Sequence, residues 1–139
     1  MAEDTVLFEG DTEQGHYLVV DTIYSGRSAR VLFSGTRQAA QSGEAKDGKP
    51  ELLFDYNERF MELVRGLRPK RILLIGGGAF TLPKALQAEF PRVILDVVEL
   101  DGKLFDIAQA YFDFKPSRQT HIYIGDGRML LQKATELYD

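Results

Sequence analysis

The 139-residue chain contains no cysteine and only two histidines. Without cysteine it can form neither a disulfide nor a thiolate metal site. Neither His16 nor His121 has a nearby acid or serine in the sequence that suggests a catalytic triad, and no spacing resembles a metal site. We therefore expect both histidines to be structural and the protein to hold no metal.

Long apolar runs and an excess of positive charge are also missing. No run approaches the roughly 20 residues that span a membrane, and the net charge of −4 argues against a general nucleic-acid binder. The N-terminus lacks the basic start and long apolar core of a signal peptide. We expect a cytoplasmic protein that binds neither membrane nor nucleic acid.

The strongest positive feature is a short apolar run, Ile72–Ile75, closed at once by Gly76–Gly78. Such a run predicts a strand of a parallel sheet that is buried on both faces. Consecutive glycines let the backbone turn sharply and approach a ligand. With Thr81 as cap and Pro83 in the first turn, a helix is predicted over 82–89. Strand, glycine turn and helix N-terminus together indicate a nucleotide-type site.

Two acids follow later strands of the same predicted sheet. The run 93–98 ends at Glu99, and the run 119–124 ends at Gly125–Gly127, which includes Asp126. A carboxylate at the end of the second strand can accept both hydroxyls of a ribose. We expect Glu99 to be a rim carboxylate; the alternative is a solvated loop acid beside a mere tight turn. Asp126 can also cap a helix over 128–137, as Asp101 can over 102–112.

The N-terminal third has a different pattern. Strands are predicted near 5–9, 16–24 and 28–33, with a turn over 10–12, and a polar loop over 36–50 that contains Gln41. A helix over 52–67 follows, with one apolar face that we expect to be buried: Leu53, Tyr56, Phe60, Leu63, Val64 and Leu67. The fold class is therefore α/β, with an antiparallel β unit and loop over 1–50 and a Rossmann-like parallel sheet over 51–139.

Six short motifs, in order along nearly the whole chain, carry a resemblance to a known family. They are Gln41-Ser42, Tyr56–Glu58, Leu74–Gly78, Val98–Asp101, Gly125–Gly127 and Tyr138-Asp139. The series resembles the spermidine synthases, or polyamine aminopropyltransferases, whose methyltransferase-like Rossmann fold follows a small β domain. The resemblance implies aminopropyl transfer from decarboxylated S-adenosylmethionine to putrescine in polyamine biosynthesis, with release of methylthioadenosine. In the family's full fold a further strand pairs with Ile72–Ile75; without it these residues would lie at one side of the sheet as an apolar edge, and we expect association into a homodimer.

The resemblance also implies roles for single residues. Glu99 would bind the ribose hydroxyls and Asp126 the adenine amino group. The backbone of Gly76–Gly78 would approach the nucleoside. Gln41 and the pair Tyr56-Asn57 would line the donor and acceptor pocket.

Two departures from the family pattern bear on activity. Ala79 stands where the family has an aspartate that anchors the donor's ammonium group, and Phe80 replaces the next glycine. The family's catalytic aspartates follow a strand that begins just after Tyr138-Asp139. We therefore expect a chain that stops before the catalytic loop, contains only the first half of the sheet and is inactive alone.

Three alternatives remain open at this stage. One is a methyltransferase that uses S-adenosylmethionine itself, which the loss of the anchor at Ala79 favours. Another is a nicotinamide-dependent dehydrogenase, against which Thr81 in place of the third fingerprint glycine counts. The third is a non-catalytic binding or dimerisation module that keeps the fold without the chemistry.

Overall fold

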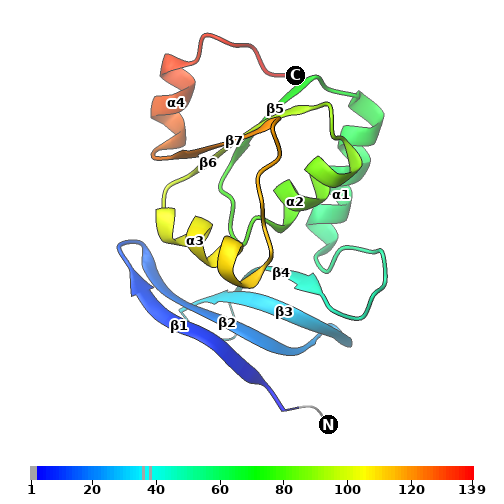
Figure 1. The fold of residues 1–139 in the computed structure, drawn as a ribbon, viewed down its shortest axis with the longest axis vertical. Coiled ribbons are helices and arrows are strands. Elements are labelled where there is room, and N and C mark those ends of the chain that lie inside the picture. The colour runs from blue at the N-terminus through cyan, green and yellow to red at the C-terminus, as the bar shows by residue number, and fades with distance from the viewer. Residues whose placement is uncertain (1–2, 36, 38) are drawn as a thin grey trace. The chain divides into compact units, whose positions relative to one another are not determined.

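The computed structural model describes residues 3–35, 37 and 39–139. Contacts divide the chain into two compact units, a first unit that ends at Arg59 and a second unit over Phe60–Asp139. The first contains an antiparallel sheet and the second a parallel sheet with helices (Figure 1). The predicted α/β class and the order of its two sheets are confirmed, and the domain limits expected at 1–50 and 51–139 stay a prediction.

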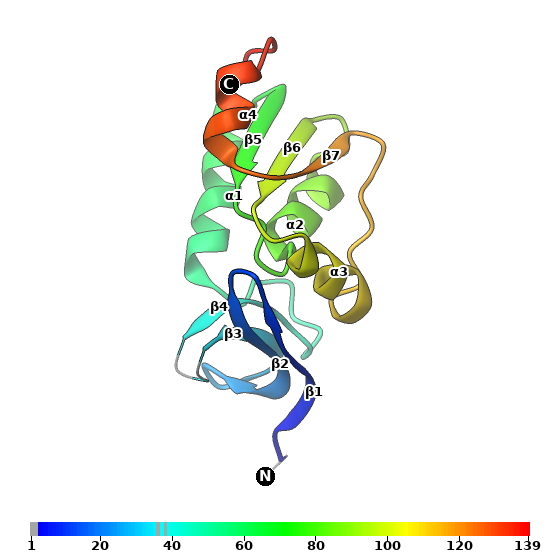
Figure 2. The ribbon, with the colours of Figure 1, turned by 90° about the vertical axis from the view of Figure 1, so that its left-hand side faces the viewer.

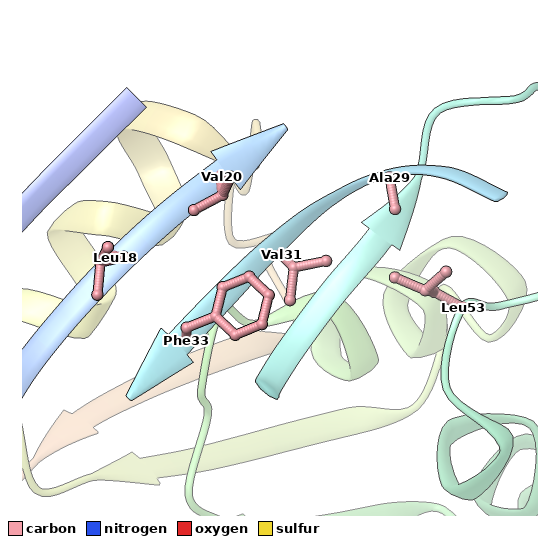
Figure 3. Close-up of a cluster of buried hydrophobic side chains, with 6 residues drawn as sticks. All are labelled: Leu18, Val20, Ala29, Val31, Phe33 and Leu53. Carbon is pink, nitrogen blue, oxygen red and sulfur yellow. The ribbon is translucent and has the colours of Figure 1, made fainter. Parts of the chain in front are cut away.

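The first unit is a four-stranded antiparallel sheet in the order β1-β2-β3-β4. Its strands are β1 Thr5–Thr12, β2 Gly15–Tyr24, β3 Arg27–Ser34 and β4 Ala40–Ala45. Alternate residues of a strand point to the same face, so one face of β2 and β3 gathers apolar side chains into a core. Figure 3 shows this core, formed by Leu18, Val20, Ala29, Val31, Phe33 and Leu53.

Two expectations for this unit are wrong. Residues 10–12 continue β1 instead of turning, and the expected loop over 36–50 contains β4, which pairs with β3 through Val31 and Gly43. Residues 36 and 38 of that loop lie outside the described part of the chain. A Cβ on Gly43 would lie 2.8 Å from the backbone oxygen of Arg30. The sequence of β4 has little β propensity, and close backbone pairing overrides that preference.

Helix α1, Asp55–Leu67, begins three residues later than expected and buries a different face. Asn57, Met61 and Val64 are its buried residues, whereas the expected stripe leaves four side chains exposed: Tyr56, Phe60, Leu63 and Leu67. Apolar residues cover much of the circumference of this helix, so spacing alone does not determine which arc turns inward.

The second unit alternates strand and helix. Its sheet has the order β5-β6-β7 and contains β5 Arg71–Ile75, β6 Ile94–Glu99 and β7 Thr120–Ile124, all parallel. The helices are α2 Thr81–Glu89, α3 Gly102–Tyr111 and α4 Gly127–Lys133, which ends four residues earlier than expected. As predicted, the glycine strand lies at one side of the sheet, next to β6 (Figure 2).

The expectation that Ile72–Ile75 is buried on both faces is wrong. All residues of β5 are at least partly accessible and Ile75 is 61% exposed, whereas Leu95–Glu99 of β6 are buried. In the described part of the chain β5 has a neighbouring strand on one side only. The apolar run identified the strand, and the exposure of its residues follows from its place at the edge of the sheet. None of the described helices is long and apolar enough to cross a membrane.

Candidate functional site

The glycine turn lies at the carboxyl end of β5. Gly76 and Gly78 have φ angles of 90° and 57°, which residues with a Cβ rarely adopt. The N–H of Gly76 donates to the carbonyl of Val98 at 2.7 Å, so the turn is fixed to β6. The prediction that these glycines permit a sharp turn is confirmed.

The turn ends at Phe80, which caps α2 with a left-handed φ of 59° and makes no side-chain cap hydrogen bond. The expectation that Thr81 caps the helix is therefore wrong, because the helix already includes that residue. The side chains of Ala79 and Phe80 are fully buried. From Gly76 to Phe80 the loop thus offers a ligand backbone groups and no charged side chain.

Glu99 ends β6 and is only 6% exposed. One carboxylate oxygen accepts the N–H of Gly77 at 3.0 Å, and the other accepts the N–H of Asp101 at 2.7 Å. Glu99 is therefore buried and fixed in orientation. It is not the rim carboxylate that we expected from the sequence, and it is not the alternative, a solvated loop acid. Since a carboxylate oxygen has two lone pairs, each oxygen keeps capacity for a further donor.

Asp126 lies just beyond β7 and is exposed. Its carboxylate accepts the N–H of Arg128 at 2.8 Å, which confirms the capping role, as Lys103 N–H to Asp101 does for α3. Because β6 and β7 pair in parallel register with Glu99 opposite Ile124, both acids lie at the carboxyl edge of the sheet. This is the edge at which ligands of open α/β sheets bind.

The other predicted site residues lie in the first unit. The Tyr56 hydroxyl donates to the backbone carbonyl of Gln41 at 3.1 Å. Although the side chain is 45% exposed, partial desolvation of the hydroxyl, with a smaller contribution from Tyr24, raises the pKa of Tyr56. Asn57 is buried, and its side-chain oxygen has no hydrogen-bond partner among the described residues, which leaves an acceptor that a bound donor could satisfy. Gln41 stands in β4 and not in a loop.

Sequence reasoning missed a polar network centred on Asp96. This nearly inaccessible carboxylate accepts hydrogen bonds from the Tyr138 hydroxyl at 2.7 Å, from Nδ1 of His121 at 2.8 Å and from Arg71 at 2.7 Å. Burial alone would raise the pKa of Asp96, but the three donors outweigh it and the pKa is lowered. Arg71 also stacks on the Tyr138 ring at 5.4 Å.

The network adjoins a cavity of about 420 Å³ on the α4 side of the sheet. Its polar wall includes Arg71, Asp96 and Tyr138, and its apolar wall includes Val98 and Met129. The signal that could have revealed the network is Asp96 itself. A lone acid inside the apolar run 93–98 must be paired when that strand is buried.

In the folded chain both histidines lie beside acids that are not apparent as partners in the sequence. His16 contacts Asp11 at 2.6 Å and Glu9 at 2.9 Å, and His121 contacts Asp96. The two acids beside His16 raise its pKa, Glu9 more strongly than Asp11. Among the described residues, no group of three or more His, Cys, Asp or Glu could hold a metal ion.

The chain is similar in sequence to an aminopropyltransferase and to methyltransferases. No family model matches it. Over 67 residues it is 40% identical to the polyamine aminopropyltransferase of Vibrio vulnificus, a match that covers 48% of this chain and 22% of that protein. It is also 27% identical, over 146 aligned positions, to putrescine N-methyltransferase 2 of Nicotiana tabacum, covering 98% of this chain and 37% of that one.

Solved structures agree in fold. A probable spermidine synthase from Corynebacterium glutamicum matches with a TM-score of 0.73 and 20% identity, over 92% of this chain and 47% of that chain. The spermidine synthase of Thermotoga maritima matches with a TM-score of 0.72 and 19% identity, over 96% and 45%. The chain thus has the fold of spermidine synthases and spans about half the length of these structures.

Proposed function

We propose that the chain binds an S-adenosylmethionine-type nucleoside at the carboxyl edge of the sheet in the second unit. The observation that carries the proposal is Glu99, a buried carboxylate that the N–H groups of Gly77 and Asp101 hold in one orientation. Its remaining lone pairs can accept the two hydroxyls of a ribose, and charge-assisted hydrogen bonds of this kind are strong.

The other site residues have proposed roles that follow from the resemblance. The backbone of the turn at Gly76–Gly78, exposed at Gly76 and half-buried at the next two glycines, lets the nucleoside approach closely. Asp126 accepts the adenine amino group while it caps α4. Gln41, Tyr56 and Asn57 line the donor and acceptor pocket, and the oxygen of Asn57, which has no partner in the described part of the chain, suits an amine donor.

The proposed reaction class of the whole protein is aminopropyl transfer to putrescine. An amine nitrogen attacks the carbon next to the donor's sulfonium, the carbon–sulfur bond breaks, and the sulfur leaves as the thioether methylthioadenosine. The amine loses a proton to a base, and general base catalysis of this kind typically contributes about 10²–10⁴-fold. Three further expectations stay predictions: the 139-residue chain alone does not catalyse this transfer, it forms a homodimer, and it lies in the cytoplasm.

A methyl donor is the second candidate. The loop from Gly76 to Phe80 has no acid to hold the lone ammonium group of a decarboxylated donor. The similarity to a putrescine N-methyltransferase over 98% of the chain supports the same candidate. Calorimetric titration with S-adenosylmethionine and with its decarboxylated form separates the two, since a methyl donor site should bind S-adenosylmethionine more tightly and an aminopropyl donor site the decarboxylated form.

Titration with methylthioadenosine, which both donors contain, tests the site itself. Glu99→Gln should weaken its binding by about 1–3 kcal/mol, because two ribose hydroxyls lose an ionised acceptor. Glu62→Gln, at an exposed position of α1, is the matched control and should bind like the wild type. Unchanged affinity in Glu99→Gln would remove this residue from the site. A folded chain that binds no adenosyl compound would favour the non-catalytic module.

A further inference from the structure

The conformation of Phe80 is unusual for a residue with a large side chain. Its φ of 59° is left-handed and its side chain is fully buried. Such conformations persist only where the surroundings enforce them, and they concentrate at ligand sites. The ring packs against Phe114 and Phe105, with centroids 5.1 Å and 5.5 Å away. The aromatic cluster of these three residues thus holds the ring against the glycine turn.

The ring of Phe80 fills the space beneath Gly77. A Cβ on Gly77 would lie 2.5 Å, 2.6 Å and 2.9 Å from the three outermost ring carbons, Cζ, Cε2 and Cε1. These distances are too short for any real Cβ, so the turn rests directly on the ring. The φ of Gly77 is not left-handed, unlike those of Gly76 and Gly78. Gly77 therefore has to be glycine because of the ring and not because of its backbone conformation.

The N–H of Gly77 is also the group that donates to Glu99. We infer that Phe80 is a positioning residue. Its ring fixes the position of the turn, and with it the position of the Gly77 N–H that orients the Glu99 carboxylate for a ribose. This inference rests on the proposed nucleoside site. It assigns a role to a side chain that has no contact of its own with the ligand.

A substitution that lifts the turn from the ring tests the inference. Gly77→Ala adds a methyl group where the ring stands, so methylthioadenosine should bind about tenfold more weakly, a typical cost of lost preorganisation. Gly66→Ala is the matched control, since a Cβ there meets no atom within 4 Å. It should leave the affinity unchanged.

A second variant tests whether the clash with the Phe80 ring causes the weaker binding in Gly77→Ala. Phe80→Leu removes the three outermost ring carbons and makes room for the added methyl group. Gly77→Ala should then weaken binding less than about twofold relative to Phe80→Leu alone, because the clash is gone. An equal penalty in both backgrounds would overturn the inference, since it would mean that the methyl group obstructs the ligand directly.

A third measurement does not depend on ligand. The Gly77 amide should exchange its hydrogen faster in Phe80→Leu than in the wild type, because its hydrogen bond to Glu99 is no longer supported. Phe112→Leu, at another fully buried phenylalanine of this unit, should leave that exchange unchanged. Equal exchange in Phe80→Leu and wild type would contradict the inference. A wild-type chain that binds no methylthioadenosine would instead contradict the proposed function and leave this exchange test standing.

Discussion

The two faces of the parallel sheet differ in chemistry although the same strand supplies both. On the face toward α2, β6 presents Leu95, which lies beside Leu86 and Phe90 of the α2 segment, and Glu99 follows at its end. On the face toward α4, the same strand presents Asp96 and Val98 to the cavity. One face is closed by apolar packing and the other carries a network of charges.

The two faces of the sheet therefore contribute to the second unit in different ways. Apolar packing on the α2 face fixes the strands and the glycine turn, because close-packed side chains tolerate little displacement. On the α4 face the contacts of Asp96 are directional and partly accessible, since the side chains of Arg71 and His121 are 20% and 45% exposed. The α4 face should therefore respond to pH, whereas the α2 face should respond mainly to volume.

The largest expected effect is on the α2 face. Leu95→Ala should lower the free energy of unfolding by about 3 kcal/mol, because the buried side chain leaves a cavity that rigid neighbours cannot close. Denaturant unfolding followed by circular dichroism measures the loss. Leu137→Ala is the control, since that side chain is 90% exposed. A loss below about 1 kcal/mol for Leu95→Ala would show that the α2 face is loosely packed.

On the α4 face the corresponding change is Asp96→Leu. It should cost about 2 kcal/mol, because Arg71, His121 and Tyr138 all lose their shared acceptor while some solvent still reaches Arg71. Hydrogen exchange of the β6 amides reports the loss locally. Asp106→Asn, an exposed acid of α3, should have almost no effect. Equal exchange in Asp96→Leu and wild type would mean that the network contributes nothing to stability.

The two faces also differ in how well the sequence predicts them. Apolar runs at 72–75, 93–98 and 119–124 predicted three parallel strands, because buried strands have few other patterns. The partners of Asp96 were not predicted, since they come from positions as distant as Arg71 and Tyr138 and meet only after folding.

Within the candidate site, the position of Glu99 at a strand end was predictable and its burial was not. Strand ends follow from the pattern of the chain, but the hydrogen bonds from Gly77 and Asp101 depend on how two loops converge. The support of the turn by Phe80 was hidden for the same reason. β4 was missed because its pairing with β3 depends on the small size of Gly43 and not on propensity.

Acidification should weaken the α4 face selectively. The pKa of Asp96 is lowered from its usual value by its three donors, so the ionised form stabilises the folded state above pH ~4, the usual value for aspartate, and this stabilisation is lost as pH falls through the folded pKa. The stability difference between wild type and Asp96→Leu should therefore shrink as pH falls below ~4. Denaturant titrations of both proteins at several pH values measure it. A difference that stays constant down to pH ~2 would contradict an ionised Asp96.

The smallest expected effect comes from the tyrosine of the network. Tyr138→Phe keeps the ring that stacks on Arg71 but removes the hydroxyl that donates to Asp96. Since Arg71 and His121 still satisfy the carboxylate, the loss should be about 1 kcal/mol, the usual net contribution of one hydrogen bond. Tyr123→Phe is the control on the same cavity, because the Tyr123 hydroxyl has no hydrogen bond within the described part of the chain. If Tyr138→Phe cost as much as Asp96→Leu, the hydroxyl alone would hold the network together, and the α4 face would depend on one contact instead of three.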